Sequence, residues 1–400
     1  MILAKDIKIL IALIPVVLLG PMAMDIFLPA LGEIQQFFLM NTNQVQWTLS
    51  IFVMGYGLCQ LFVGKLTKPQ HTFRTLILAV TTFMFASLVC ALAQQKIIFF
   101  VGRLLQAISA CFCTVIAFAI TRRAASSDKA CAKICSIISG FTGFAPIVAP
   151  SIGGFIIAVS NWHFVFYIQA AVAFISLLFL LRLIGQKFIF VKSVYNTMDY
   201  HVVYSDPMFW RYACYGSGGM VILFTFFSVA HNIFVSKLGL SNHLFPYVFS
   251  IYAAGFVIGS FLNAYLIDTV DLNLILNRAM AAVSGIAIVI VLQSYFMASL
   301  ALSVILMFLI NFCLGFVFSS ALPGALINYK GLSEIASSVY GAQQFLIAFL
   351  LTTFYVAYFQ INLKSLGCFV FCVSVLTLIV SFILKSKYRG CINVQHKSVM

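Results

Sequence analysis

The sequence predicts an all-α membrane protein with twelve spanning helices arranged in two bundles of six. Hydrophobic residues make up 63% of the 400 residues, whereas charged residues make up only 8%. A soluble domain contains about 25% charged residues, so this chain cannot cover a water-facing surface. In addition, apolar runs of about 20 residues, the length that crosses the hydrocarbon of a bilayer, recur along the whole chain.

Twelve such runs follow one another in order. We expect spanning helices near residues 8–31, 44–64, 75–94, 97–121, 134–158, 162–182, 208–235, 243–267, 277–297, 299–328, 335–360 and 364–384. The first run is about twice as long as the apolar part of a signal peptide and no small-x-small cleavage site follows it, so we interpret it as an uncleaved helix.

The most polar internal gap lies between the sixth and seventh runs, and no soluble domain fits in any gap. It predicts a cytoplasmic linker over residues 185–207, between an N-terminal bundle (1–184) and a C-terminal bundle (208–400). Each bundle would contain six of the twelve helices.

Positive charges indicate the orientation, because cytoplasmic loops of membrane proteins are rich in Lys and Arg. With the N-terminus in the cytoplasm, most of the 23 Lys and Arg residues fall on that side, and only Lys96, Lys237 and Lys364 fall outside. Both termini are therefore expected in the cytoplasm. The net charge of +14 is explained by this topology and by anionic lipid headgroups, without a nucleic-acid partner.

Two charges fall at membrane depth. Asp25 is the one carboxylate of nine that lies well inside a predicted helix, and Arg103 is the one comparably deep cation. Burying either costs at least about 2.5–3.5 kcal/mol. Each lies about 9 Å below the outer face at 1.5 Å per residue, so we expect them either to form a pair or to share a water-filled cavity. Asp25 is then a candidate titratable site, and a static ion pair is the alternative.

Neutral polar side chains at similar depth are the candidates for a substrate cavity. Each alone is also compatible with a helix–helix hydrogen bond. The candidate cavity residues are Trp47, Tyr56, Gln60, Gln106, Gln169, Asn232, Asn311 and Gln343.

The fifth run contains "GFTGFAPIVAPSIGGFI", residues 140–156, with four glycines and two prolines in one spanning helix. Glycines permit close approach of two backbones, and each proline removes a backbone hydrogen bond and allows a kink. The segment is either a tightly packed helix or a hinge between moving halves.

This segment resembles the antiporter motif of major facilitator superfamily exporters, in the form typical of their bicyclomycin/chloramphenicol-resistance branch. "MDIFLPAL" in the first run, "GRLLQAISA" in the fourth and "NWHFVFYI" in the sixth are similar to the same branch. The resemblance implies two six-helix bundles that alternate access around a central cavity. It also implies proton coupling through Asp25 and Arg103, and an antiporter motif formed by Gly143, Pro146, Pro150, Gly153 and Gly154.

One loop departs from the family pattern. The superfamily loop after the second helix usually reads Gly-x-x-x-Asp-Arg-x-Gly-Arg-Arg, whereas residues 64–74 read "GKLTKPQHTFR", with Lys68 in place of the acid. Arg123 or its neighbour stands where an acid is usual after the fourth helix. The charged contact that this loop normally makes is therefore expected to be missing or rebuilt.

The sequence thus predicts a proton-driven exporter of small molecules, drug-like compounds or an endogenous product such as a siderophore, in a bacterial inner membrane and as a monomer. A small-metabolite importer and a non-transporting sensor or scaffold are the alternatives. The sequence contains no recognisable nucleophile–base set, phosphate loop or metal cluster, so we expect neither enzymatic activity nor a bound metal or cofactor. The expected energy source is the proton gradient. The eleven cysteines lie mostly in apolar runs, where they act as small hydrophobic residues.

Overall fold

A computed structural model describes residues 4–67, 71–183, 200–240, 244–296 and 299–397. Within these ranges the side chains of some helical residues, including Pro146, Pro150 and residues 387–397, lie outside the description. Most of the predicted linker, residues 184–199, also lies outside it, so the predicted domain boundaries stay a prediction.

The described residues contain twelve helices of at least 21 residues and no β-strand. These are α1 (Ala4–Asp25), α3 (Thr42–Leu66), α4 (Thr72–Leu92), α5 (Lys96–Ala124), α6 (Asp128–Val159), α7 (Trp162–Leu183), α9 (Pro207–His231), α10 (Phe245–Leu266), α11 (Leu272–Phe296), α12 (Leu300–Leu326), α13 (Ser333–Tyr358) and α14 (Leu363–Lys397). The shorter elements are a 3-10 turn (Leu28–Ala30), α2 (Leu31–Phe37), α8 (Tyr200–Tyr204) and a π-helical segment (Asn232–Lys237) that continues α9.

Eleven spans in the described residues are long and apolar enough to cross a membrane, and the first of them, Asp6–Phe37, combines α1, the 3-10 turn and α2. The helix α6 has 32 residues but is not among the eleven. The order and spacing of the helices confirm the predicted twelve-helix fold. The chain is therefore a multi-pass membrane protein.

Local signals in the sequence explain where several helices begin. Asn41 accepts a hydrogen bond from the backbone N–H of Gln44, whose side chain accepts one from the backbone of Asn41, so α3 begins with a capping box. Ser127 caps α6 through the backbone N–H of Ala130, and Ser299 caps α12 in the same way. These caps satisfy backbone donors that a helix leaves free at its start.

The described chain forms two compact units. Unit 1 contains residues 1–134, 141–198 and 329–342, and unit 2 contains residues 135–140, 199–328 and 343–400. Two helices are divided between them: a short piece of α6 belongs to unit 2, and the first ten residues of α13 belong to unit 1.

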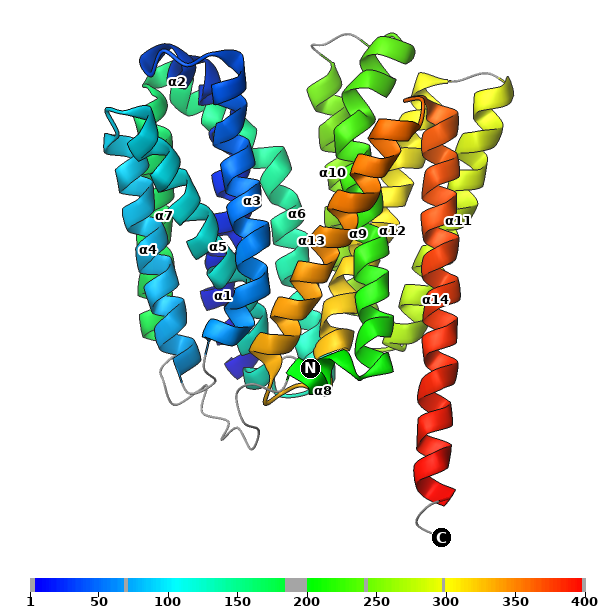
Figure 1. Ribbon diagram of the computed structural model, residues 1–400. Coiled ribbons are helices and arrows are strands. Elements are labelled where there is room, and N and C mark those ends of the chain that lie inside the picture. Colours follow the sequence, from blue (N-terminus) through cyan, green and yellow to red (C-terminus); the bar gives the residue numbers. More distant parts are fainter. Residues whose placement is uncertain (1–3, 68–70, 184–199, 241–243, 297–298, 398–400) are drawn as a thin grey trace. The chain divides into compact units, whose positions relative to one another are not determined.

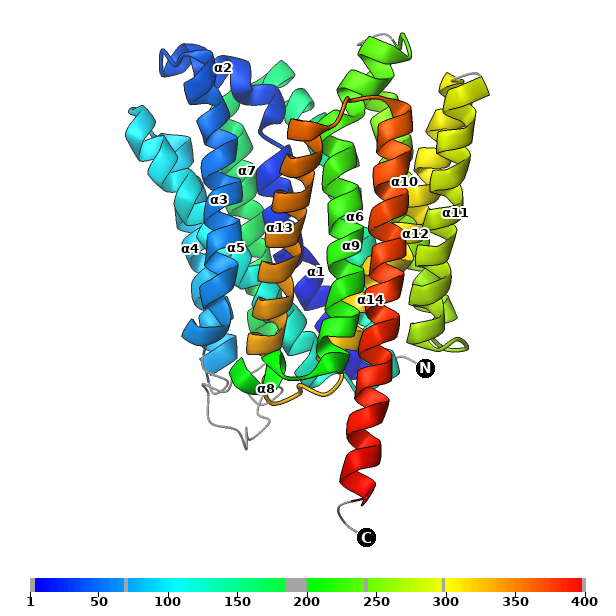
Figure 2. The ribbon, with the colours of Figure 1, turned by 45° about the vertical axis from the view of Figure 1, so that its right-hand side comes forward.

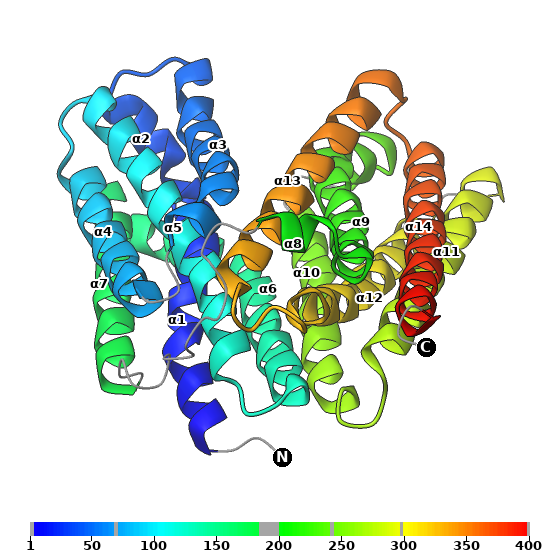
Figure 3. The same ribbon diagram turned by 60° about the horizontal axis from the view of Figure 1, so that its bottom comes forward.

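In unit 1, α5 packs against α1, α3 and α4, while α7 packs against α1 and α4 (Figures 1 and 3). The helix α5 is therefore central, which explains why nearly all of its last fourteen residues are buried. A charged side chain on α5 can be kept from lipid only if these neighbours surround it.

In unit 2, α12 is the central helix and packs against α9, α10 and α11, while α14 packs against α9 and α11 (Figure 2). Three glycines, Gly255, Gly259 and Gly315, bring α10 and α12 together. A Cβ added to Gly259 would lie 2.1 Å from the carbonyl oxygen of Phe312, and one added to Gly315 would lie 2.5 Å from that of Phe256. Larger residues cannot occupy this seam without separating the helices.

Candidate functional site

The first spanning segment breaks at Asp25. The sequence predicted this residue well inside a helix, but it is the last residue of α1, followed by a short turn and the 3-10 turn. Pro29 supplies the physical reason: it has no N–H to donate to the carbonyl of Asp25 four residues earlier, so the helix cannot continue unchanged. The Asp25 side chain is half-buried at this break.

Arg103 of α5 reaches the last turn of α1. Its Nη1 donates to the carbonyl oxygen of Ala23 at 3.0 Å, which uses an acceptor that a helix end leaves without a helical partner. Arg103 is fully buried, and its guanidinium carbon lies over the rings of Phe27 and Phe52, 4.0 and 4.7 Å from their centroids. The aromatic faces and the carbonyl together offset part of the cost of burying the cation.

Asp25 and Arg103 thus meet the same turn of the chain, as their predicted depths suggested. No ion pair joins them in the described part of the structure. The Nε and Nη2 atoms of Arg103 are buried and have no hydrogen-bond partner. Direct pairing, one of the two predicted arrangements, is therefore not present in this structure.

A network of neutral side chains holds Arg103 from the other side. Its Nη1 also donates to Oε1 of Gln106 at 2.9 Å. The Nε2 of Gln106 donates to Oγ of Ser87 at 2.7 Å and to Oε1 of Gln169 at 2.8 Å. Gln106 and Gln169 are almost completely buried, so these two predicted cavity residues are part of a helix–helix network joining α4, α5 and α7.

The antiporter segment on α6 also contacts the break in α1. A Cβ added to Gly153 would lie 2.0 Å from the carbonyl oxygen of Ile26, the residue after Asp25. Only glycine fits there without a backbone shift. Gly154 differs from the expectation of close packing, because nothing lies within 4 Å of its added Cβ. Gly143 is half-buried, and the side chains of Pro146 and Pro150 lie outside the description.

The other predicted cavity residues are divided between the two units. In unit 1, Trp47 is exposed, Tyr56 stacks on Phe52 with 6.4 Å between ring centroids, and Gln60 is buried against Gly341.

In unit 2, Asn232 is exposed and Asn311 donates to the carbonyl oxygen of Tyr252 at 2.7 Å. Gln343 donates to the carbonyl oxygen of Ala213 at 3.1 Å and to the Ser217 hydroxyl. The two sets belong to different units.

Sequence reasoning missed a second buried charge cluster. Arg123, at the end of α5, forms an ion pair with Glu334 in the first turn of α13, and both side chains are 1% exposed. Arg123 also donates to Ser333 Oγ at 2.9 Å and to Thr72 Oγ1 at 3.1 Å, while Thr72 donates to Glu334. All four residues belong to unit 1. The charged contact is therefore rebuilt without the loop acid, with the cation on α5 and the carboxylate on α13.

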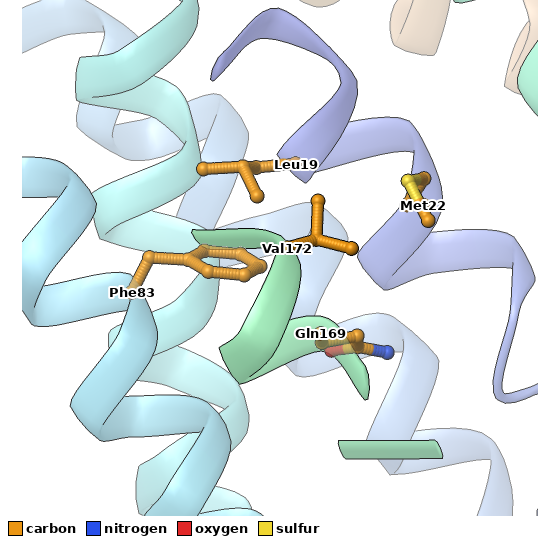
Figure 4. Close-up of a pocket in the computed structure, with 5 residues that line it drawn as sticks. All are labelled: Leu19, Met22, Phe83, Gln169 and Val172. Atoms are coloured by element: carbon orange, nitrogen blue, oxygen red, sulfur yellow. The ribbon is translucent and has the colours of Figure 1, made fainter. Parts of the chain in front are cut away.

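A small pocket lies beside the Gln106 network (Figure 4). Leu19, Met22, Phe83, Gln169 and Val172 line a narrow gap between α1, α4 and α7. It is too narrow to hold a water molecule, and four of its five lining residues are apolar. It is therefore a packing defect beside the network and not a substrate site.

Metal ligands do not gather in the described residues, where no group of three or more His, Cys, Asp or Glu side chains could hold an ion. The chemistry available at the break in α1 is thus that of one carboxyl group, one guanidinium and neutral amides. Such a set can bind a proton and hydrogen-bond a solute.

Curated relatives match part of the chain. It is 32% identical over 168 residues to "Multidrug resistance protein MdtL" of Salmonella paratyphi C (strain RKS4594), and 31% identical over 168 residues to the same-named protein of Salmonella typhimurium. Each match covers 42% of this chain and 42% of the relative, so the similarity spans less than half the length of either protein.

Solved structures share the fold over nearly the whole chain. The proton:xylose symporter XylE matches with a TM-score of 0.74 and 12% identity, covering 96% of both chains. FucP matches with a TM-score of 0.74 and 16% identity, covering 95% of this chain and 99% of that one. At these identities the likeness concerns the fold alone. The model of the Major Facilitator Superfamily matches residues 13–352, and the chain therefore belongs to that family.

Proposed function

We propose that this protein is a proton-coupled exporter of small molecules that works by alternating access in a bacterial inner membrane, with both termini in the cytoplasm and as a monomer. Its substrates are drug-like compounds or an endogenous product such as a siderophore. The energy source is the proton gradient, and no cofactor or metal takes part.

The observation that carries this proposal is the position of Asp25. A carboxyl group stands at a break in a spanning helix, half-buried, with a fully buried arginine bonded to the same turn. A carboxyl group in a poorly hydrated site near a cation changes its proton affinity when either hydration or the distance to the cation changes. Movement of the last turn of α1 relative to Arg103 would therefore load or release a proton.

The antiporter segment supports the same interpretation. Gly153 packs on the backbone of Ile26, so a tilt of α6 is transmitted to the residue next to Asp25. The multidrug-resistance relatives support export of drug-like compounds, although their similarity covers only 42% of the chain. The bicyclomycin/chloramphenicol-resistance branch remains the most specific resemblance of the sequence motifs.

The test uses purified full-length protein in liposomes with an imposed pH gradient. Chloramphenicol and ethidium serve as a neutral and a cationic probe, and internal pH is followed with a trapped dye. We expect either probe to move against its gradient in exchange for protons. Movement of probe and protons in the same direction would instead indicate an importer, and no flux with either probe, with siderophore-loaded vesicles also inactive, would favour a sensor or scaffold.

A further inference from the structure

Gln106 and Gln169 have the residue type and depth expected of substrate contacts, but their hydrogen bonds give them another role. Both donors of the Gln106 amide are used, one to Ser87 and one to Gln169, and its carbonyl oxygen faces Arg103. With 0% and 2% exposure, neither glutamine offers a surface to a solute.

The network has a defined direction. The Ser87 hydroxyl donates to the carbonyl oxygen of Phe83 at 2.8 Å, so its lone pairs accept from Gln106. Gln169 accepts from Gln106 through Oε1. A reversed Gln106 amide would place N–H groups against the guanidinium, which cannot accept them, and would leave two acceptors without donors. Ser87 and Gln169, together with the donor-only guanidinium, therefore favour the orientation in which Oε1 of Gln106 meets Arg103.

Gln106 in turn sets the position of the guanidinium. Nη1 of Arg103 is held between Oε1 of Gln106 and the carbonyl oxygen of Ala23, while Nε and Nη2 are free of partners. The three remaining determinants of its position are the rings of Phe27 and Phe52 and the covalent link to α5. Loss of the amide contact would let the cation move relative to the last turn of α1.

We infer that Ser87 and Gln169 are positioning residues for Arg103, acting through Gln106, and that they thereby tune the proton affinity of Asp25. This inference rests on the proposed function. Helices α5 and α7 pack against α1, and Arg103 is the cation on them that bonds its last turn. The other groups near this end are occupied elsewhere: Glu33 of α2 accepts from the backbone of Trp162, and His163 of α7 bonds the carbonyl oxygen of Ala91.

Further groups complete this environment. The thiol of Cys90 contacts Gln106 Oε1 at 3.8 Å. Lys96 stands in the first turn of α5 and is half-buried. Tyr167 of α7 is exposed. Of these groups, Arg103 is the fully buried cation that bonds the last turn of α1.

The experiment compares Gln169→Met and Ser87→Ala with Ser176→Ala in the full-length protein. Ser176 is a buried hydroxyl of α7 that bonds its own helix at Val172, so it controls for the loss of a buried polar group. The readout is the pH dependence of probe-induced proton release. We expect both network variants to move its midpoint upward by about 0.5 to 1 pH unit, because one net hydrogen bond is worth about that shift.

A second arm separates positioning from general loosening. In an Arg103→Lys background, Gln169→Met should cause no further shift, because the planar guanidinium that the network holds is already gone. A midpoint that stays at the wild-type value in both network variants, or one that moves equally in Ser176→Ala, overturns the inference. Absence of probe-induced proton release from the wild type instead overturns the proposed function, so the two failures are distinguishable.

Discussion

Unit 1 and unit 2 both bury polar side chains between packed helices, but the groups that they bury differ. In unit 1, Arg103 is buried at membrane depth beside the break at Asp25, and Arg123 and Glu334 are buried at the helix ends. In the described helices of unit 2, the buried groups between helix centres are neutral, as in the contacts of Asn263 with Ser136 and Ser320. Unit 2 also buries a cation near a helix end, Arg211 of α9, which donates to the Ser381 hydroxyl.

This difference indicates that the two units have different roles in transport. A neutral amide or hydroxyl can join two helices or hydrogen-bond a solute, but it cannot take up a proton near neutral pH. Charged groups are costly in the membrane and are retained where they act. We therefore expect proton coupling to depend on unit 1, and unit 2 to contribute only packing and neutral contacts. Four predictions test this contrast.

The largest effect is expected at Asp25. Asp25→Asn keeps the side-chain volume and removes the titration, so the protein should insert and fold but lose proton-driven probe flux down to the level of empty liposomes. Asn311→Leu, in unit 2, should keep proton-driven flux. Glu33→Gln is a matched control, because it neutralises a carboxylate on the next element of the same span. Wild-type-like flux in Asp25→Asn would contradict the assignment of coupling to unit 1.

A large loss of stability is expected when the buried ion pair is broken. Arg123→Ala leaves the Glu334 carboxylate buried beside Thr72 without its cation, which costs about 3–5 kcal/mol in free energy of unfolding. Asn263→Ala removes a neutral network in unit 2 and should cost about 1–3 kcal/mol.

Thermal unfolding of the purified variants measures both changes. The double variant Arg123→Leu with Glu334→Leu should recover most of the loss, because it buries no unpaired charge. If Arg123→Ala lowers the stability no more than Asn263→Ala does, the ion pair does not stabilise unit 1 more than a neutral network stabilises unit 2.

The sequence predicted the helices well because length and apolarity alone define a spanning segment. The contact of Arg103 with Gln106 is local, since residues three apart share a helix face. It missed the ion pair of Arg123 with Glu334 because 211 positions separate them and each residue has an ordinary explanation at a helix end. The break at Asp25 had a local signal, Pro29, which the apolar run concealed.

Adjacent glycines show the same limit at smaller scale. Gly153 and Gly154 are equivalent in the sequence, but only Gly153 faces the backbone of Ile26. Which face of α6 meets α1 is a tertiary property, and no pattern within the motif reports it. The two positions therefore form a natural pair for mutagenesis.

An intermediate effect is expected from this pair. Gly153→Ala should push the α1 break away from α6 and lower proton-driven flux at least about tenfold, since misplacing a reacting group by about 1 Å costs up to 100-fold. Gly154→Ala should be close to wild type, because its Cβ meets open space. Gly259→Ala, against Phe312 in unit 2, should lower thermal stability without changing the pH profile. Equal flux in the two α6 variants would refute the contact with Ile26 as a functional one.

The smallest effects are expected from the neutral amides of unit 2. Nδ2 of Asn311 bonds Tyr252, and its buried Oδ1 has no partner in the structure, so this oxygen can accept a hydrogen bond from a solute only when the helices around it move apart during alternating access. Asn311→Leu should therefore weaken probe binding by about 2- to 10-fold, the value of one net hydrogen bond. Gln293→Met is the control, because Gln293 joins α11 to α12 through Ser303 and is not a candidate cavity residue.

Titration of probe binding at several pH values gives both the affinity for the probe and the pH midpoint. A change of affinity in Asn311→Leu at an unchanged pH midpoint would support the division between the units. A shifted midpoint would mean that unit 2 takes part in proton coupling after all, and an affinity loss as large in Gln293→Met would reduce Asn311 to a packing residue.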